Sequence, residues 1–332
     1  MKAIADPIDC QLLDNWQRDF PVTPRPFAIL AKDVDLSEDE VLERLATMSR
    51  AGRISRVGAT CAPNTISAST LAAIAAPPNR IEEVVAIIND ESGVNHSYLR
   101  ENEWNLWFVA TGPTRDFVDA ALERIQTRSG LRVLDLRLVR PFNLDLGFRM
   151  SGPRATTAQA QPRHLDLSVI QTGDRDILQR LTEGLPLVSQ PYAALGQSLK
   201  RPESDILDRI TALQKAGIIS RLGVIVRHRA LGWRANAMVV WDLPSDQIDA
   251  AGPRLAALPG VTLCYERRPV PGIWPYRLYS MIHARNQVEA GEFLAGATAT
   301  PELAGVPHQA LFSTQCFKQT GALIKPSAEP VL

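Results

Sequence analysis

Residues 26–58 read PFAILAKDVDLSEDEVLERLATMSRAGRISRVG, and residues 191–223 read PYAALGQSLKRPESDILDRITALQKAGIISRLG. The two stretches align without a gap at an offset of 165 residues, and 12 of the 33 aligned positions are identical. A repeat of this length indicates a duplicated domain and excludes a short solenoid repeat. Because the two copies have diverged, a site built between them can be asymmetric, which the isologous interface of a homodimer does not readily allow.

The length and composition predict a soluble protein of two main domains. A chain of 332 residues is long enough for two domains of about 150 residues, each with its own core. The formal net charge of zero provides no field that attracts nucleic acid or an anionic membrane. We find no apolar run long enough for a membrane span or a signal peptide, so we expect a cytoplasmic protein with no membrane partner.

Three helical patterns and a strand open each half, which is the order of a winged helix-turn-helix. The helix predicted at 37–51 begins with a capping box, in which Ser37 pairs with Glu40, and it ends at Gly52. The full set comprises helices at 8–18, 26–31 and 37–51 with a strand at 53–60, and helices at 174–183, 191–198 and 202–216 with a strand at 218–226.

A βαββαβ pattern follows each winged helix and predicts an antiparallel sheet with helices on one face. In the first half, strands are expected at 69–76, 94–101, 104–111 and 131–140, and helices at 80–91 and 114–128. In the second half, strands are expected at 235–243, 261–267, 276–284 and 308–317, and helices at 245–258 and 286–297. A polar stretch between the halves, with few periodic apolar residues, is the predicted linker.

These patterns predict an α+β protein with a tandem duplication, in which each half is a winged helix-turn-helix followed by a ferredoxin-like βαββαβ domain. The expected boundaries are 1–66 and 67–150 for the first pair of domains, 151–173 for the linker, and 174–232 and 233–325 for the second pair. This layout resembles the feast/famine (Lrp/AsnC-type) regulators over nearly the whole chain, twice.

That resemblance implies one possible function, a DNA-binding regulator that senses a small metabolite. Such a protein places its third helix in the major groove of DNA. Here the third helix begins with Ser37-Glu38-Asp39-Glu40, and its copy carries acids at 203, 205 and 208. DNA affinity comes mainly from Lys and Arg side chains that neutralise phosphates, so these acids oppose it. We therefore expect no nucleic-acid partner.

The hairpins of the βαββαβ units carry an unusual mixture of cationic and aromatic residues. Strand alternation places His96, Tyr98 and Arg100 on one face of the first hairpin. The second hairpin repeats the pattern with Tyr265 and Arg267, and a basic triplet, RHR, follows the second wing at 227–229. Guanidinium groups beside aromatic rings suit a large, flat, polyanionic ligand, because the rings cover its faces and the guanidiniums hold its carboxylates.

The same segments resemble a known enzyme family. GVNHSYLRENEWNLWFV resembles one subunit type of the siroheme decarboxylases, and RHRALGWRANAMVVWDLP, CYERRPVPGIWPYRLYSMIH and LFSTQCFKQTG resemble the partner subunit type. The resemblance implies a fused two-subunit form, which is associated with haem d1 biosynthesis, whereas unfused pairs also serve an alternative haem pathway. It further implies that siroheme loses CO2 from its acetates at ring positions 12 and 18, giving 12,18-didecarboxysiroheme. No cofactor is consumed, and the siroheme iron belongs to the substrate.

With this resemblance, the candidate residues take specific roles. His96 is expected to donate a proton or to bind the substrate iron as an axial ligand, and His228 is the second candidate for catalysis. Tyr98 and Tyr265 would orient a carboxylate or relay a proton. The residues expected to bind the substrate are Arg100, Arg227, Arg267, Arg268, Trp274, Tyr276, Arg56, Arg221 and Lys318.

Several residues also have a purely structural interpretation. Arg56 and Arg221 recur in both copies within ISR-[VL]-G, which fits a link between wing and helix as well as a ligand contact. Lys318 would either anchor a propionate or cap the final strand. His283 alternates with Met281 and is expected to be part of the buried structure.

The two halves differ at the position of the first-choice histidine, because Leu263 stands where the first half has His96. A single histidine would then serve one site per chain. Processing two acetates requires either that the substrate rebinds after turning or that a second site exists, for example in a homodimer of fused chains. Paralogous decarboxylase subunits are another expected kind of partner. The alternatives are a divergent Lrp/AsnC-type regulator and a tetrapyrrole-binding sensor or carrier.

Overall fold

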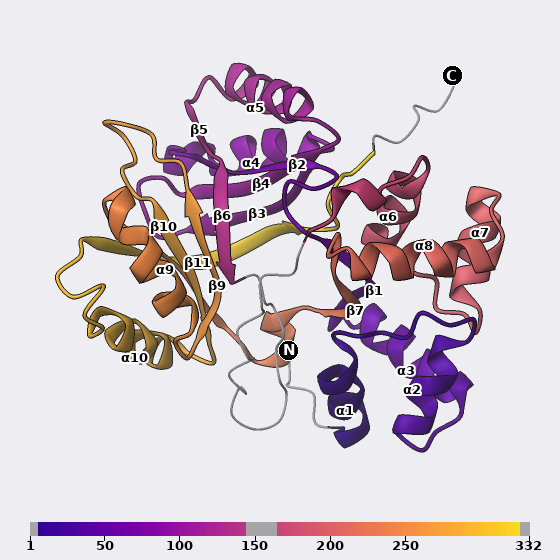
Figure 1. The fold of residues 1–332 in the computed structure, drawn as a ribbon. Helices are drawn as coiled ribbons and strands as arrows, with labels where there is room; N and C mark the ends of the chain where they lie inside the picture. Colours follow the sequence, from indigo (N-terminus) through magenta and orange to yellow (C-terminus); the bar gives the residue numbers. More distant parts are fainter. Residues whose placement is uncertain (1–5, 144–164, 326–332) are drawn as a thin grey trace.

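The two winged-helix units lie together on one side of the molecule, and the two βαββαβ units form the other side (Figure 1). The computed structural model describes residues 6–143 and 165–325. Most of the predicted linker at 151–173, and the tail after 325, lie outside the described residues. The segment at 165–173 contains a short 3-10 helix, η2 (Leu167–Val169).

The winged-helix elements form where the sequence predicts them. The first unit consists of α1 (Pro7–Trp16), α2 (Pro26–Asp33), α3 (Glu38–Arg50) and β1 (Ile54–Cys61). The second consists of α6 (Asp174–Glu183), α7 (Pro191–Leu199), α8 (Glu203–Lys215) and β7 (Ile219–Val226). The predicted capping box is confirmed, since the Ser37 side chain accepts from the Glu40 backbone N–H and the Glu40 side chain accepts from the Ser37 backbone N–H.

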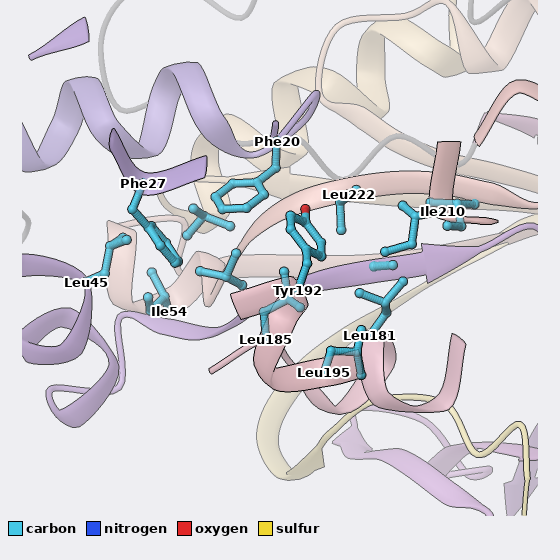
Figure 2. Packing of buried hydrophobic residues seen from close by; sticks show 14 of the residues in the cluster. Phe20, Phe27, Leu45, Ile54, Leu181, Leu185, Tyr192, Leu195, Ile210 and Leu222 are labelled. Carbon is cyan, nitrogen blue, oxygen red and sulfur yellow. The ribbon is translucent and has the colours of Figure 1, made fainter. Parts of the chain in front are cut away.

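The two winged-helix units share a single hydrophobic core. Strands β1 and β7 pair with each other in an antiparallel two-stranded sheet. Side chains from both units pack in one buried cluster, in which Phe20 of the first unit lies near Tyr192 and Leu222 of the second (Figure 2). Neither unit therefore has a complete core of its own.

The repeated glycine of ISR-[VL]-G has a structural cause in this packing. The first helix of each half ends against the wing strand of the other half, and a Cβ added to Gly58 would lie 2.3 Å from the Leu181 carbonyl oxygen. A Cβ at Gly223 would lie 2.3 Å from the Gln17 backbone carbon. Both distances are too short for any side chain, so the recurrence reflects close backbone approach.

The βαββαβ elements are also present in both halves. The first half contains β2 (Ala68–Ile74), α4 (Ile81–Asp90), β3 (Val94–Arg100), β4 (Leu106–Gly112), α5 (Arg115–Ser129), β5 (Val133–Leu136) and β6 (Leu138–Asn143). The second half contains β8 (Ala235–Trp241), α9 (Ile248–Ala256), β9 (Val261–Arg267), β10 (Leu278–Ala284), α10 (Gln287–Thr298) and β11 (His308–Gln319). Short 3-10 helices add η1 (Pro78–Arg80), η3 (His228–Leu231) and η4 (Ser245–Gln247).

The strand predicted at 131–140 is wrong as a single strand, because it divides into two that serve different halves. Strand β5 pairs with β2 of its own half, whereas β6 pairs with β9 of the second half. Strand β11 likewise pairs with β8 through residues 308–312 and with β3 through 313–319. All nine strands therefore form one sheet in the order β5-β2-β4-β3-β11-β8-β10-β9-β6.

The helices cover one face of each half of the sheet. α4 and α5 lie over the first half, and α9 and α10 over the second (Figure 1). The faces without helices contribute to one shared buried cluster, in which Trp107 of the first half packs with Met238, Trp274 and Tyr279 of the second. Strands β5 and β6 are the two ends of this order, and only Arg137 separates them in the sequence. The sheet therefore curls round, and the helix-free faces of its two halves are turned toward each other.

Candidate functional site

Strand β3 carries three of the predicted residues on its helix-free face. Ser97 points to the other face, where its hydroxyl lies 2.7 Å from the Asn89 side-chain oxygen of α4. The rings of His96 and Tyr98 lie 6.4 Å apart between centroids and are nearly parallel. The guanidinium of Arg100 lies 5.5 Å from the centre of the Tyr98 ring. The predicted alternation of His96, Tyr98 and Arg100 is therefore present.

Strand β9 repeats the tyrosine–arginine pair from the other half. The Arg267 guanidinium lies 4.9 Å from the Tyr265 ring centre and 5.8 Å from that of Tyr279. Arg267 Nη1 donates to the Leu136 carbonyl at 2.8 Å. Arg100 Nη1 donates to the Leu311 carbonyl at 3.0 Å. Each arginine thus bonds to a backbone carbonyl of the other half, Arg267 at the end of β5 and Arg100 within β11.

The symmetry of the two pairs is broken by His96. Leu263 of β9 packs against the apolar cluster between the two halves. His96 occupies the corresponding place on β3, where it is half-buried beside Tyr98. The described residues therefore place an imidazole beside one tyrosine–arginine pair and an apolar side chain beside the other.

Two further arginines reach this face from the winged-helix units. Arg56 of β1 lies close enough to His96 for its charge to act on the imidazole. Arg229 of η3 donates to the Ser313 carbonyl at 2.7 Å, and its charge acts on Tyr98 and Arg100. Sequence reasoning missed Arg229 as an individual site residue, although it belongs to the basic triplet at 227–229 that marks the region.

These cations are buried or half-buried without acidic partners in the described residues. The Nε atoms of Arg56, Arg100, Arg229 and Arg267 are buried and have no hydrogen-bond partner among residues 6–143 and 165–325. Within the same residues, none of the four forms an ion pair with a carboxylate. Native proteins rarely leave buried donors unpaired, and an unpaired buried charge is costly. The arrangement fits a binding site for an anionic ligand.

Burial sets the protonation states of the site. Burial, together with the nearby charge of Arg56, lowers the pKa of His96 to about 4. Burial raises the pKa of Tyr98 and of Tyr265 above the usual range, so both hydroxyls are protonated at neutral pH. Burial also lowers the pKa of Arg100 to about 10, which leaves it charged. At neutral pH the site thus presents a neutral imidazole, two phenols and a group of cations.

Three of the predicted substrate ligands lie elsewhere. Lys318 Nζ donates to the Asn89 carbonyl at 2.9 Å, on the helix-covered face at the end of α4. Arg268 is exposed and lines a separate cavity of about 340 Å³ together with Arg137. Trp274 is only 3% exposed, and its indole N–H donates to the Tyr279 hydroxyl at 2.8 Å, so it is part of the core.

The remaining candidates have mixed placements. Tyr276 is half-buried and packs edge-on against Trp274 at 4.8 Å between ring centroids. Arg221 mirrors Arg56 on β7, where burial lowers its pKa to about 10. Arg227 is exposed, and its charge reaches Cys316 of β11. His228 lies in η3, but its side chain is outside what the structure describes.

The fold and the site define a class of protein: two winged-helix and AsnC-like halves fused in one chain, with a cationic face between them. A family model for the AsnC-like ligand binding domain matches residues 66–142 and 230–318, and one for the siroheme decarboxylase NirDL-like HTH domain matches residues 9–54 and 174–219. The chain is 55% identical to the siroheme decarboxylase NirDL subunit of Paracoccus pantotrophus, over 96% of this chain and 98% of that protein. The chain belongs to the siroheme decarboxylase family, which confirms the predicted family and the tandem fold.

Solved structures and separate subunits extend the comparison. A crystal structure of the siroheme decarboxylase NirDL in complex with an iron-uroporphyrin III analogue matches with a TM-score of 0.66 at 25% identity, over 94% of this chain and 92% of that chain. Single subunits from Stutzerimonas stutzeri match part of the chain: NirL is 43% identical over 47% of this chain and 92% of its own length, and NirD is 41% identical over 45% and 97%. No helix in the described part of the chain is long and apolar enough to cross a membrane.

Proposed function

We propose that this chain is a siroheme decarboxylase that removes CO2 from the acetates at ring positions 12 and 18 to give 12,18-didecarboxysiroheme. The observation that carries the proposal is the group of four arginines, Arg56, Arg100, Arg229 and Arg267, whose buried Nε donors have no partner in the described residues. Siroheme is a flat tetrapyrrole with carboxylates around its rim, and arginine forks bind carboxylates well. The tyrosine rings beside Arg100 and Arg267 supply flat surfaces of the kind that such a ligand contacts.

The reaction replaces the carboxylate of each acetate by one hydrogen. The bond between the methylene carbon and the carboxyl carbon breaks, CO2 leaves, and a proton becomes part of the new methyl group. We propose His96 as the proton donor. Its pKa of about 4 means that the imidazole is neutral at neutral pH, but a polyanionic substrate favours the charged imidazole and raises that pKa. Substrate binding therefore brings the proton that the reaction uses.

An alternative role for His96 is that of an axial ligand to the substrate iron. A neutral imidazole is the form that binds metal, and the low pKa supplies it. The two roles have different consequences, because an axial ligand changes the absorption spectrum of the bound siroheme whereas a proton donor takes up a proton on binding. We place the donor role first because Arg56 and Tyr98 are ready to orient a carboxylate beside the imidazole.

The arginines hold the carboxylates that stay, and the carboxylate that leaves must be held weakly. Strong binding of the reacting carboxylate would stabilise the ground state and raise the barrier. Arg100 and Arg267 are therefore assigned to carboxylates away from the reacting acetate, and the protonated Tyr98 and Tyr265 donate hydrogen bonds. In this proposal no cofactor is consumed, and the iron arrives with the substrate.

The proposal includes the setting of the enzyme. It acts in the cytoplasm, in the biosynthesis of haem d1 or in an alternative haem pathway, either as a homodimer of fused chains or with paralogous subunits. DNA binding is the weaker candidate because the arginines of the third helices are engaged by acids: Arg44 lies 2.8 Å from Asp9, and Arg209 lies 2.7 Å from Asp174. We therefore propose no nucleic-acid partner.

The test is to incubate the purified chain with siroheme under anaerobic conditions and to separate the products by chromatography with mass detection. Loss of two carboxyl groups as CO2 is the expected result, and loss of one would indicate a missing partner subunit. Siroheme that binds, with a shifted absorption band, but stays unchanged would favour a sensor or carrier. An absence of binding, with a salt-dependent shift of a promoter fragment, would favour the regulator.

A further inference from the structure

A buried chain of polar side chains runs from Arg100 into the second half. Arg100 Nη1 donates to Asn236 Oδ1 at 3.1 Å. The Asn236 amide nitrogen lies 2.6 Å from His283 Nε2, and His283 Nδ1 lies 2.7 Å from the Thr262 hydroxyl. All four residues are buried, and His283 is only 3% exposed. Burying these polar side chains costs desolvation free energy and adds nothing to an apolar core. We therefore expect their hydrogen bonds to hold a specific arrangement.

The hydrogen-bond geometry assigns one protonation state to this chain. Because arginine only donates, Asn236 must present its oxygen to Arg100 and its NH2 group to His283. His283 Nε2 is therefore the acceptor. The Thr262 hydroxyl donates to the Met281 carbonyl at 3.1 Å, so its oxygen accepts from His283 Nδ1–H. Each side chain orients the next one, and this series of hydrogen bonds ends at the guanidinium of Arg100.

The second arginine lacks such a chain. In the first half, the register pair that corresponds to Asn236 and His283 is Ser69 and Thr111, which face each other across β2 and β4. Thr111 is engaged elsewhere, since its hydroxyl donates to the Gly93 carbonyl. Arg267 thus donates to a strand carbonyl of the other half, as Arg100 does, but among the described residues it has no asparagine and histidine behind it. The supported arginine is the one on the same strand face as His96.

We propose that Asn236 and His283 are positioning residues that aim the Arg100 guanidinium at a substrate carboxylate on the His96 side of the site. This inference rests on the proposed function and adds to it the reason why one half of a nearly symmetric site is reactive. The bond from Asn236 uses Nη1 and leaves Nε of Arg100 without a partner in the described residues. The free edge of the guanidinium is therefore available to a ligand while its orientation is fixed.

The test compares His283→Leu with His283→Gln in the full chain, by absorption titration with siroheme and by steady-state kinetics. Gln places an oxygen near the position of Nε2 and can accept from Asn236, whereas Leu cannot. His283→Leu releases Asn236 and so leaves the Arg100 guanidinium unaimed, and the loss of one hydrogen bond between a carboxylate and this charged group corresponds to a change of about 10- to 100-fold in affinity. We expect His283→Leu to raise the Kd and KM for siroheme by this factor with a smaller fall in kcat, and His283→Gln to restore most of the affinity.

A second variant keeps the test informative if His283→Leu fails to fold. Asn236→Asp keeps an acceptor for Arg100 but replaces the NH2 group that donates to His283, and its carboxylate competes with the substrate for the guanidinium, so weaker siroheme binding is expected. Thr111→Val is the matched control: it removes a buried polar group of the first half and should lower stability without changing siroheme affinity. Wild-type affinity in either His283→Leu or Asn236→Asp would overturn the inference, as would equal weakening by His283→Leu and His283→Gln.

The outcomes also separate this inference from the proposed function. A wild-type chain that binds siroheme without releasing CO2 would overturn the decarboxylase function, and the affinities of the variants would still decide the role of Asn236 and His283. A wild-type chain that does not bind siroheme would overturn both.

Discussion

At the scale of single residues, the site could be predicted where strand alternation decides the side-chain direction. It could not be predicted where a contact depends on how separate elements pack together. Strand alternation was enough to place His96, Tyr98 and Arg100 on one face, and the structure brings their side chains together. The same rule could not show that Lys318 faces α4, because a register shift between Cys316 and Lys318 changes the face that β11 presents. Arg229 was missed because its contact with Ser313 depends on how η3 packs against β11.

His96 predicts a specific dependence of stability on pH. Its folded-state pKa is about 4, below the ordinary value of 6.5, so the unfolded chain binds the proton more tightly. The stabilising contribution is present above pH 6.5 and is lost as the pH falls through about 4. In the wild type, the free energy of unfolding should fall across this window by up to roughly 1.4 kcal/mol per pH unit from this group.

The measurement is urea unfolding at several pH values for the wild type and His96→Gln. The variant should show a flatter pH dependence between about 4 and 6.5, because the group that titrates is gone. Identical slopes in the two proteins would show that His96 is not held neutral by the fold.

Arg56 predicts a conflict between stability and binding. It is half-buried with no acidic partner in the described residues, and burial lowers its pKa. Met has a similar length and no charge, so Arg56→Met should raise the free energy of unfolding by about 1 kcal/mol or more. The same change should weaken siroheme binding by about tenfold, because one carboxylate partner is lost. A variant that is both less stable and unchanged in siroheme affinity would contradict a ligand-binding role for Arg56.

At the scale of elements, the periodicity of apolar residues predicted the helices and strands but not which strands pair with each other. The helix at Asp174–Glu183 and the strand at Val261–Arg267 have the predicted bounds. The crossing of β6 and β11 between halves could not be predicted, because the pattern of a strand shows which face is apolar but not which neighbour it pairs with. The division of 131–140 follows from this crossing, since β5 and β6 each need a different partner.

The contact between α6 and β1 gives a prediction about Gly58. An alanine there would bring its Cβ to 2.3 Å from the Leu181 carbonyl oxygen, which belongs to backbone and cannot turn away. We expect Gly58→Ala to destabilise the fold by about 1–3 kcal/mol through overpacking. Gly296 in α10 has no heavy atom within 4 Å of an added Cβ, so Gly296→Ala should stabilise by roughly 0.5–1 kcal/mol. Thermal unfolding of the two variants tests the contact, and equal stabilities would exclude it.

At the scale of the whole molecule, the duplication behaves as two subunits joined by a linker. The winged-helix units share one core, and β3 pairs with β11 across the halves. Neither half can therefore pair all of its own strand edges or complete the winged-helix core by itself. The sequence predicted the duplication and the asymmetry at His96 and Leu263, but the shared core depends on contacts between residues more than 150 positions apart.

This arrangement predicts the behaviour of the separated halves. If the chain is divided within residues 144–164, the two fragments should form a stable one-to-one complex when they are expressed together. Each fragment expressed alone should aggregate, because half of the winged-helix core is missing and the β3 edge is exposed. Co-purification through a tag on one fragment, followed by size-exclusion chromatography, tests this. Two fragments that fold separately and do not associate would contradict the shared core.

The central claim is that the face carrying His96 and Arg100 decarboxylates siroheme with a proton taken from water. The most direct test is the anaerobic reaction in D2O, with the product masses of the wild type and His96→Ala compared side by side. The account predicts that the wild-type product has lost two CO2 and carries one deuterium in each new methyl group, whereas folded His96→Ala binds siroheme and returns it unchanged. Unchanged siroheme with the wild type, or full activity in His96→Ala, would contradict it.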